Sequence, residues 1–133
     1  MHHEHNNYAN TSAVEDFLYM AIKGVVSDNV FCGTLPTTTT LPWDDMVVID
    51  CDLPIRDYDC LSLSTVYIFL YARPTENGAK NVVKLSEMER KLNTVMDNIH
   101  DDHYSINRQS NGGDYDADIN WHRNYVHINI KIS

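Results

Sequence analysis

SLSTVYIFLYARP, residues 62–74, carries the strongest strand signal in the chain. Its residues from Val66 to Tyr71 are apolar or aromatic without a polar break, a composition that favours strands. Such a run predicts a strand that is buried on both faces and therefore lies in the centre of a sheet. Pro74 lacks a backbone donor and ends the predicted strand.

An amphipathic helix of about fourteen residues is predicted directly after this strand. Residues 85–99 read LSEMERKLNTVMDNI, with apolar side chains at three- and four-residue steps. Ser86 and Glu89 have the spacing of a capping box, in which each side chain satisfies a free backbone amide at the start of a helix. We therefore expect the helix to begin there.

A second helix is predicted near the start of the chain, over about 12–23. In SAVEDFLYMAIKG the apolar residues again share one face. Thr11 or Ser12 can cap its first amides, and Lys23 with Gly24 gives a stop signal. The apolar face is made of Val14, Phe17, Leu18, Ala21 and Ile22.

The remaining strands are predicted from shorter patterns, at 30–33, 46–50, 103–110 and 121–133. In the last of these, Val126 and Ile128 alternate with polar residues, which predicts a half-exposed antiparallel strand. NGGDYDAD, residues 111–118, is predicted to be a turn, because glycine and asparagine tolerate positive φ.

These elements predict an α+β fold, in which an antiparallel sheet carries both helices on one face. Residues 12–133 form one domain, and residues 34–45 form a long irregular loop that includes LPTTTTLPW. Residues 1–11, rich in histidine and asparagine, are expected to be a flexible arm.

The charge balance excludes several classes of function. Ten Lys and Arg stand against nineteen Asp and Glu, for a formal net charge of -9. Because such a chain repels phosphate, we expect neither sequence-specific nucleic acid binding nor attachment to an anionic membrane. We see no secretory signal and no apolar run of membrane-spanning length, and three cysteines without a C-x-x-C pair fit a reducing cytoplasm.

No specific catalytic motif is present, so we expect no enzymatic activity and no cofactor. The main candidate for a catalytic metal site is the pair Asp50 and Asp52, which follow an apolar strand and could hold a magnesium ion. The cluster from His100 to His103 contains potential metal ligands, but polar residues at that place also serve to end a helix.

The order of these elements resembles the tail terminator and tail-completion (head–tail joining) family of tailed bacteriophages. The resemblance rests on a short opening helix, AVEDFLYMAIKG, and a meander of short strands and loops. The strand VYIFLYA then precedes the helix LSEMERKLNTVMDNI, and the acidic segment DYDADINWH leads into the alternating strand YVHINIKI. The resemblance covers roughly residues 12–133. The threonine-proline loop and the His/Asn arm depart from the family pattern and leave the position within the neck or tail open.

The resemblance implies a structural virion protein that forms a ring in the neck or tail, after synthesis in the host cytoplasm. Its partners would be further copies of itself and neighbouring neck or tail proteins. The long loop combines extended backbone with apolar anchors that could dock onto a neighbouring subunit, or could instead fold over the chain's own core. The residues expected at such an interface are Leu35, Thr38, Leu41, Trp43 and Trp121.

Three acids before the last strand are candidates for a channel-facing rim. Asp114, Asp116 and Asp118 alternate, so an extended backbone places them on one face, where they are expected to be solvated. They form either a plain solvated hairpin tip or the rim of a ring channel, where they would repel passing DNA. Two other functions stay open from the residues alone. One is a small soluble cytoplasmic accessory or regulatory binding domain, and the other is a divalent-metal-dependent hydrolase that uses Asp50 and Asp52.

Overall fold

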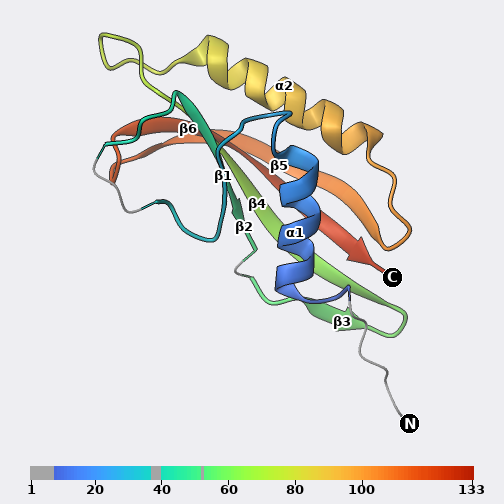
Figure 1. The fold of residues 1–133 in the computed structure, drawn as a ribbon. Helices are drawn as coiled ribbons and strands as arrows, with labels where there is room; N and C mark the ends of the chain where they lie inside the picture. Colours follow the sequence, from blue (N-terminus) through green and yellow to red (C-terminus); the bar gives the residue numbers. More distant parts are fainter. Residues whose placement is uncertain (1–7, 37–39, 52) are drawn as a thin grey trace.

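The computed structural model describes residues 8–36, 40–51 and 53–133, and it confirms the α+β fold (Figure 1). The helices are α1 (Thr11–Ile22) and α2 (Val82–Asn98). The strands are β1 (Val30–Cys32), β2 (Asp45–Asp50), β3 (Arg56–Tyr58), β4 (Leu61–Ala72), β5 (Tyr104–Asp116) and β6 (Trp121–Ile132). No helix in the described ranges is long and apolar enough to cross a membrane.

The sheet is mixed rather than purely antiparallel. Its order is β1-β2-β4-β6-β5, with β3 paired to the start of β4. Among these strands, only β1 and β2 pair in parallel. A parallel pair needs a long connection, and the chain between Cys32 and Asp45 supplies it. The predicted central strand is confirmed, because β4 lies between β2 and β6.

Both helices cover one face of the sheet, as predicted, and Figure 1 shows them on the same side. We call this side the helix face and the opposite side the open face. Alternate residues of β4, such as Val66, Ile68 and Leu70, are fully buried on the helix face. They pack with apolar residues of both helices and of β6: Val14, Leu18, Ile22, Leu85, Met88, Leu92, Val126, Ile128 and Ile130.

The prediction that β4 is buried on both faces is only half right. Its other residues are half-buried up to Phe69, and only Tyr71 is fully covered. Tyr71 belongs to a smaller cluster at one end of the open face, with Leu41, Met46, Val48 and Trp121. The aromatic residues of β4 resemble core residues by composition, although most of the open face lacks a covering element within the described ranges.

The helix starts differ from the predicted ones. Helix α2 begins at Val82, where Asn81 caps the backbone N–H of Lys84 at 3.2 Å, so Ser86 lies inside the helix and forms no capping box. Helix α1 is capped by Asn10 rather than by Thr11 or Ser12. Asparagine is as good an N-cap as serine, and its side-chain amide reaches the same orphan N–H groups.

The predicted turn at 111–118 is wrong, because β5 continues to Asp116 and the turn lies at 117–120. Gly112 and Gly113 do not adopt positive φ. Gly112 is instead required by close packing, since a Cβ there would lie 2.5 Å from the Tyr125 hydroxyl oxygen. The positive φ of the turn falls on Asn120, at 58°.

The end of the predicted flexible arm is packed against the domain. The ring of Tyr8 stacks on His103 with 3.6 Å between ring centroids, and the Tyr104 hydroxyl donates to the Tyr8 carbonyl at 2.8 Å. Residues 1–7 of that arm lie outside the described residues. The arm prediction is therefore wrong for Tyr8 to Thr11 and stays a prediction for the rest.

Candidate assembly surfaces

Aromatic side chains form a contiguous group on the open face. Phe69 of β4 is paired with Tyr125 of β6, and Tyr67 with His127. The Tyr67 and His127 rings are stacked, with centroids 4.6 Å apart, and the ring centroids of Tyr67 and Phe69 are 6.1 Å apart. All of them are half-buried, and we call Tyr67, Phe69, Tyr125 and His127 the aromatic patch.

The patch combines apolar surface with polar tips. Tyrosine and histidine rings supply rigid contact area, and residues of this kind are enriched where proteins bind one another. Beyond His127 the open face becomes polar, and the Thr65 hydroxyl donates to Asn129 Oδ1 at 3.3 Å. Nε2 of His127 is the one buried side-chain nitrogen or oxygen in the described ranges that lacks a hydrogen-bond partner.

One end of the patch is closed by an ion-pair cluster around Arg123. Its guanidinium donates to both carboxylate oxygens of Asp114, at 2.6 and 3.0 Å, and to the Tyr71 hydroxyl at 2.9 Å. The Tyr71 hydroxyl in turn donates to Asp116 at 2.8 Å. The guanidinium carbon also lies 4.1 Å from the ring centroid of Phe69, which joins the cluster to the aromatic patch.

The electrostatics of this cluster follow from these contacts. The hydrogen bond from Arg123 holds the pKa of Asp114 below its usual range, and the pKa of Arg123 is raised above its ordinary value by the same bond. Burial raises the pKa of the Tyr71 hydroxyl. The shifts of Asp114 and Arg123 both favour the charged forms, so the Asp114 carboxylate and the Arg123 guanidinium form an ion pair at neutral pH.

The three acids predicted to be solvated are not equivalent. Asp116 has a side chain only 10% exposed, so the expectation is wrong for it, and Asp114 is paired with Arg123. Asp118 is exposed, and its backbone N–H donates to Asp116 at 3.0 Å. The segment is a strand end tied to β6, which alternation alone could not show. A channel-facing role for these acids stays a prediction.

The described end of the long loop folds over the chain's own core, where Leu41 joins the smaller apolar cluster of the open face. Leu41 and Trp121 are each 6% exposed and pack together with Met46 and Tyr71. Arg73 holds the loop, because its guanidinium donates to the carbonyls of Leu41 and Trp43.

This packing bears on the predicted subunit interface. Leu41 and Trp121 are buried within the chain, so the intramolecular alternative for the loop is the one observed at these residues. Leu35 and Trp43 are only partly buried, and a contact of their exposed parts with a neighbouring subunit stays a prediction. Thr38 lies outside the described residues.

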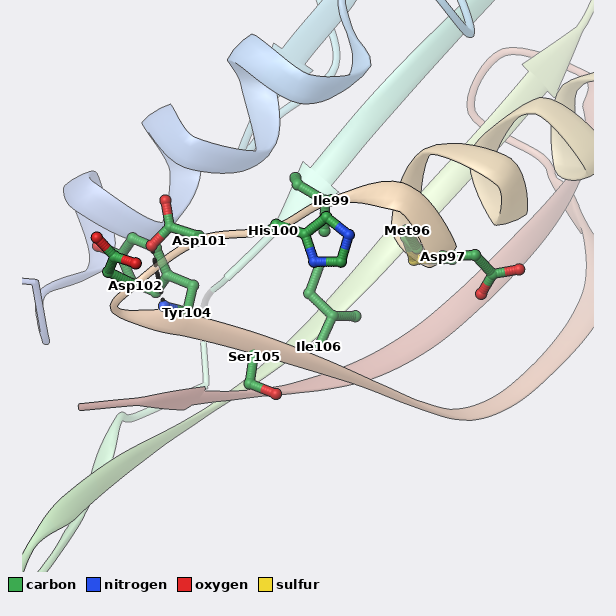
Figure 2. Close-up of a pocket in the computed structure, with 9 residues that line it drawn as sticks. All are labelled: Met96, Asp97, Ile99, His100, Asp101, Asp102, Tyr104, Ser105 and Ile106. Carbon is green, nitrogen blue, oxygen red and sulfur yellow. Dashed lines mark hydrogen bonds between the residues drawn. The ribbon is translucent and has the colours of Figure 1, made fainter.

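The histidine and aspartate cluster after α2 borders a hollow of about 490 Å³ but does not converge on a point (Figure 2). Asp101 accepts from the backbone N–H groups of His103 and Tyr104, at 2.8 and 3.1 Å, so its side chain closes the turn that leads into β5. Asp97 lies at the far end of the hollow from Asp101 and Asp102 in Figure 2, and it pairs with Arg108 at 3.2 Å.

The candidate metal residues are only partly described. Asp50 is half-buried at the end of β2, opposite Tyr67 of β4, and Asp52 lies outside the described residues. Across residues 8–36, 40–51 and 53–133, no group of three His, Cys, Asp or Glu side chains is placed to hold a metal ion.

Arg73, Arg123 and the aromatic patch were not identified from the sequence. The signal for the patch was present, because the alternation of β6 that places Val126 and Ile128 in the core also places Tyr125 and His127 together on the other face. Nothing local marks the arginines, whose partners come from distant segments.

A scan against protein-family models finds no match, and a search of curated proteins finds none either.

Proposed function

We propose that the chain is a structural protein of a tailed bacteriophage virion, where it forms a ring in the neck or tail as a tail terminator or head–tail connector component. It acts through contacts with copies of itself and with neighbouring neck or tail proteins. The observation that carries the proposal is the aromatic patch, which lies on a sheet face that the described residues cover only at one end. A contiguous, half-exposed aromatic surface of this kind is typical of protein–protein contacts.

The charge of the chain suits this role. A ring in the neck or tail encloses DNA, which must pass without being held. A net charge of -9 disfavours contacts with phosphate, and every subunit of a ring adds the same repulsion.

The proposal is tested by complementation in the phage that encodes the chain. A phage lacking the gene is supplied with the wild-type chain, with Thr65→Lys/Asn129→Lys on the open face, or with Thr94→Lys/Asn98→Lys on the exposed side of α2. Both variants add the same two charges at half-buried or exposed positions. Electron microscopy and infectious titre are the measurements.

We expect heads and tails that fail to join, or tails that are not properly completed, when the chain is absent. The wild type and the α2 control should restore infectious particles, whereas the open-face variant should fold but restore few. Complete particles without the chain would contradict a virion role and favour an accessory binding domain. Equal rescue by both variants would contradict the use of the open face.

A further inference from the structure

The outer edge of β5 is the longest strand edge that no other strand covers within the described residues. β5 is the last strand in the sheet order, so β6 alone pairs with it. It runs 13 residues, whereas β1 at the opposite edge and β3 beside β4 each run 3. Alternate residues of an antiparallel strand direct their N–H and C=O groups away from the partner, and such a row is a template for another strand.

The charged side chains of this edge form ion pairs within the chain, with Asp114 and Asp116 sharing the guanidinium of Arg123. Arg108 pairs with Asp97 at 3.2 Å, and Asp114 pairs with Arg123 at 2.6 Å. Between them, residues 109–113 carry no charge and are exposed apart from the half-buried Gly112. On a molecule with a net charge of -9, the uncharged run 109–113 is therefore the part of this edge where a second acidic copy meets the least repulsion.

The register of the edge favours pairing with itself. A register shift just before Ser110 disturbs the ladder, so the regular part for a new strand is Ser110–Asp116. Antiparallel pairing of this segment with the same segment of another copy places Gly113 opposite Gly113. Asp114 then faces Gly112 rather than another acid, which avoids a directly opposed pair of like charges.

We propose that two copies of this chain join by antiparallel pairing of Ser110–Asp116, so that their sheets form one continuous sheet across a two-fold axis. The partner strand is β5 of the second copy, because β1 and β3 are too short to match this edge. A two-fold contact closes on itself, so it is separate from the ring contact of the proposed function and does not depend on it.

The test measures self-association of the purified full chain. Size-exclusion chromatography with light scattering is run over a dilution series, and amide hydrogen exchange is compared at low and high protein concentration. The edge variant is Asn111→Lys/Tyr115→Lys, because in the proposed register residue 111 faces residue 115 of the second copy, so that lysine lies opposite lysine at two exposed positions. The control is Thr94→Lys/Asn98→Lys, which adds the same charges at two exposed positions of α2. Circular dichroism checks that both variants fold.

We expect the wild type and the control to show twice the chain mass of 15.3 kDa at high concentration and to dissociate on dilution. The edge variant should bind at least about tenfold more weakly, because like charges across paired strands repel. Amides of residues 110–116 should become more protected with rising wild-type concentration.

A wild type that is monomeric at every concentration would overturn the proposal, as would an edge variant that dimerises like the control. If the edge variant does not fold, hydrogen exchange of the wild type decides, and protection that rises only outside β5 would overturn it. Because these readouts use the purified chain alone, they are independent of the particle assembly that tests the proposed function.

Discussion

Arg123 joins acids and aromatic rings at one end of the open face. It donates to Asp114 and Tyr71, and it lies over the ring of Phe69. Asp116, with a side chain 10% exposed, also lies within ion-pair distance of Arg123, at 3.8 Å. Removal of the guanidinium leaves partly buried oxygens without their donor, and such losses are costly.

Replacement of Arg123 by methionine keeps most of the side-chain length and removes the charge. We expect Arg123→Met to lower the free energy of unfolding by about 2 kcal/mol, measured by urea denaturation. The matched control is Arg90→Met on the exposed side of α2, which should cost no more than about 0.5 kcal/mol. Equal stability of the two variants would show that the cluster contributes little.

The free energy of unfolding at acid pH should show the contribution of the Asp114 carboxylate. Its pKa is lowered in the folded chain by the hydrogen bond from Arg123, so its contribution is present above the unfolded pKa of about 3.9. That contribution is lost as the pH falls through the folded pKa. We therefore expect the difference in stability between wild type and Asp114→Asn to shrink as the pH is lowered below about 4.

Thermal unfolding at a series of pH values measures this difference. Asp102→Asn serves as the control, since Asp102 is exposed in the turn after α2. A gap between wild type and Asp114→Asn that stays constant down to the lowest pH would contradict the pairing with Arg123.

Among the elements, α2 begins at a different residue from the one that the sequence pattern predicts. Asn81 caps the helix through Lys84 N–H, and its side-chain amide donates to the Arg73 carbonyl at 3.3 Å. We expect Asn81→Ala to cost about 1 kcal/mol in urea denaturation. Ser86→Ala should be neutral or slightly stabilising, because alanine is the better helix former inside a helix. A larger loss of stability from Ser86→Ala than from Asn81→Ala would instead support the capping box predicted from Ser86 and Glu89.

The long loop is the other element whose role can be measured. Leu41 is 6% exposed in the smaller cluster, whereas Leu53 is 49% exposed. Truncation of a buried leucine removes apolar contact and leaves a cavity, so we expect Leu41→Ala to cost about 2 kcal/mol or more. Leu53→Ala should cost no more than about 0.5 kcal/mol. Similar small effects of both would indicate that the loop does not stabilise the domain.

The elements differ in how much of them could be predicted from the sequence. Helices and the central strand follow from local periodicity, so Val14, Leu18 and Ile68 were placed in the core correctly. The extension of β5 through Gly112 could not be predicted locally, because the ring that needs a glycine there belongs to Tyr125. The ties of Arg73 and Arg123 are likewise long-range, and no spacing in the chain indicates them.

At the scale of the whole molecule, the chain folds as two layers and a partial third. The helices cover the apolar core on one sheet face, and the described part of the loop covers one end of the other face. The remaining surface includes the aromatic patch and the long edge of β5, and the chain as a whole is strongly acidic. Together these features suit a subunit that works by contact with other proteins and lets nucleic acid pass.

The location of the chain in purified virions decides whether it is a structural component of the neck or tail. Antibody–gold labelling, combined with quantitative mass spectrometry of the same particles, gives position and copy number. We expect label confined to the neck or to a tail end, with several copies in every particle. A chain that remains in the soluble fraction of infected cells and is missing from infectious particles would contradict it.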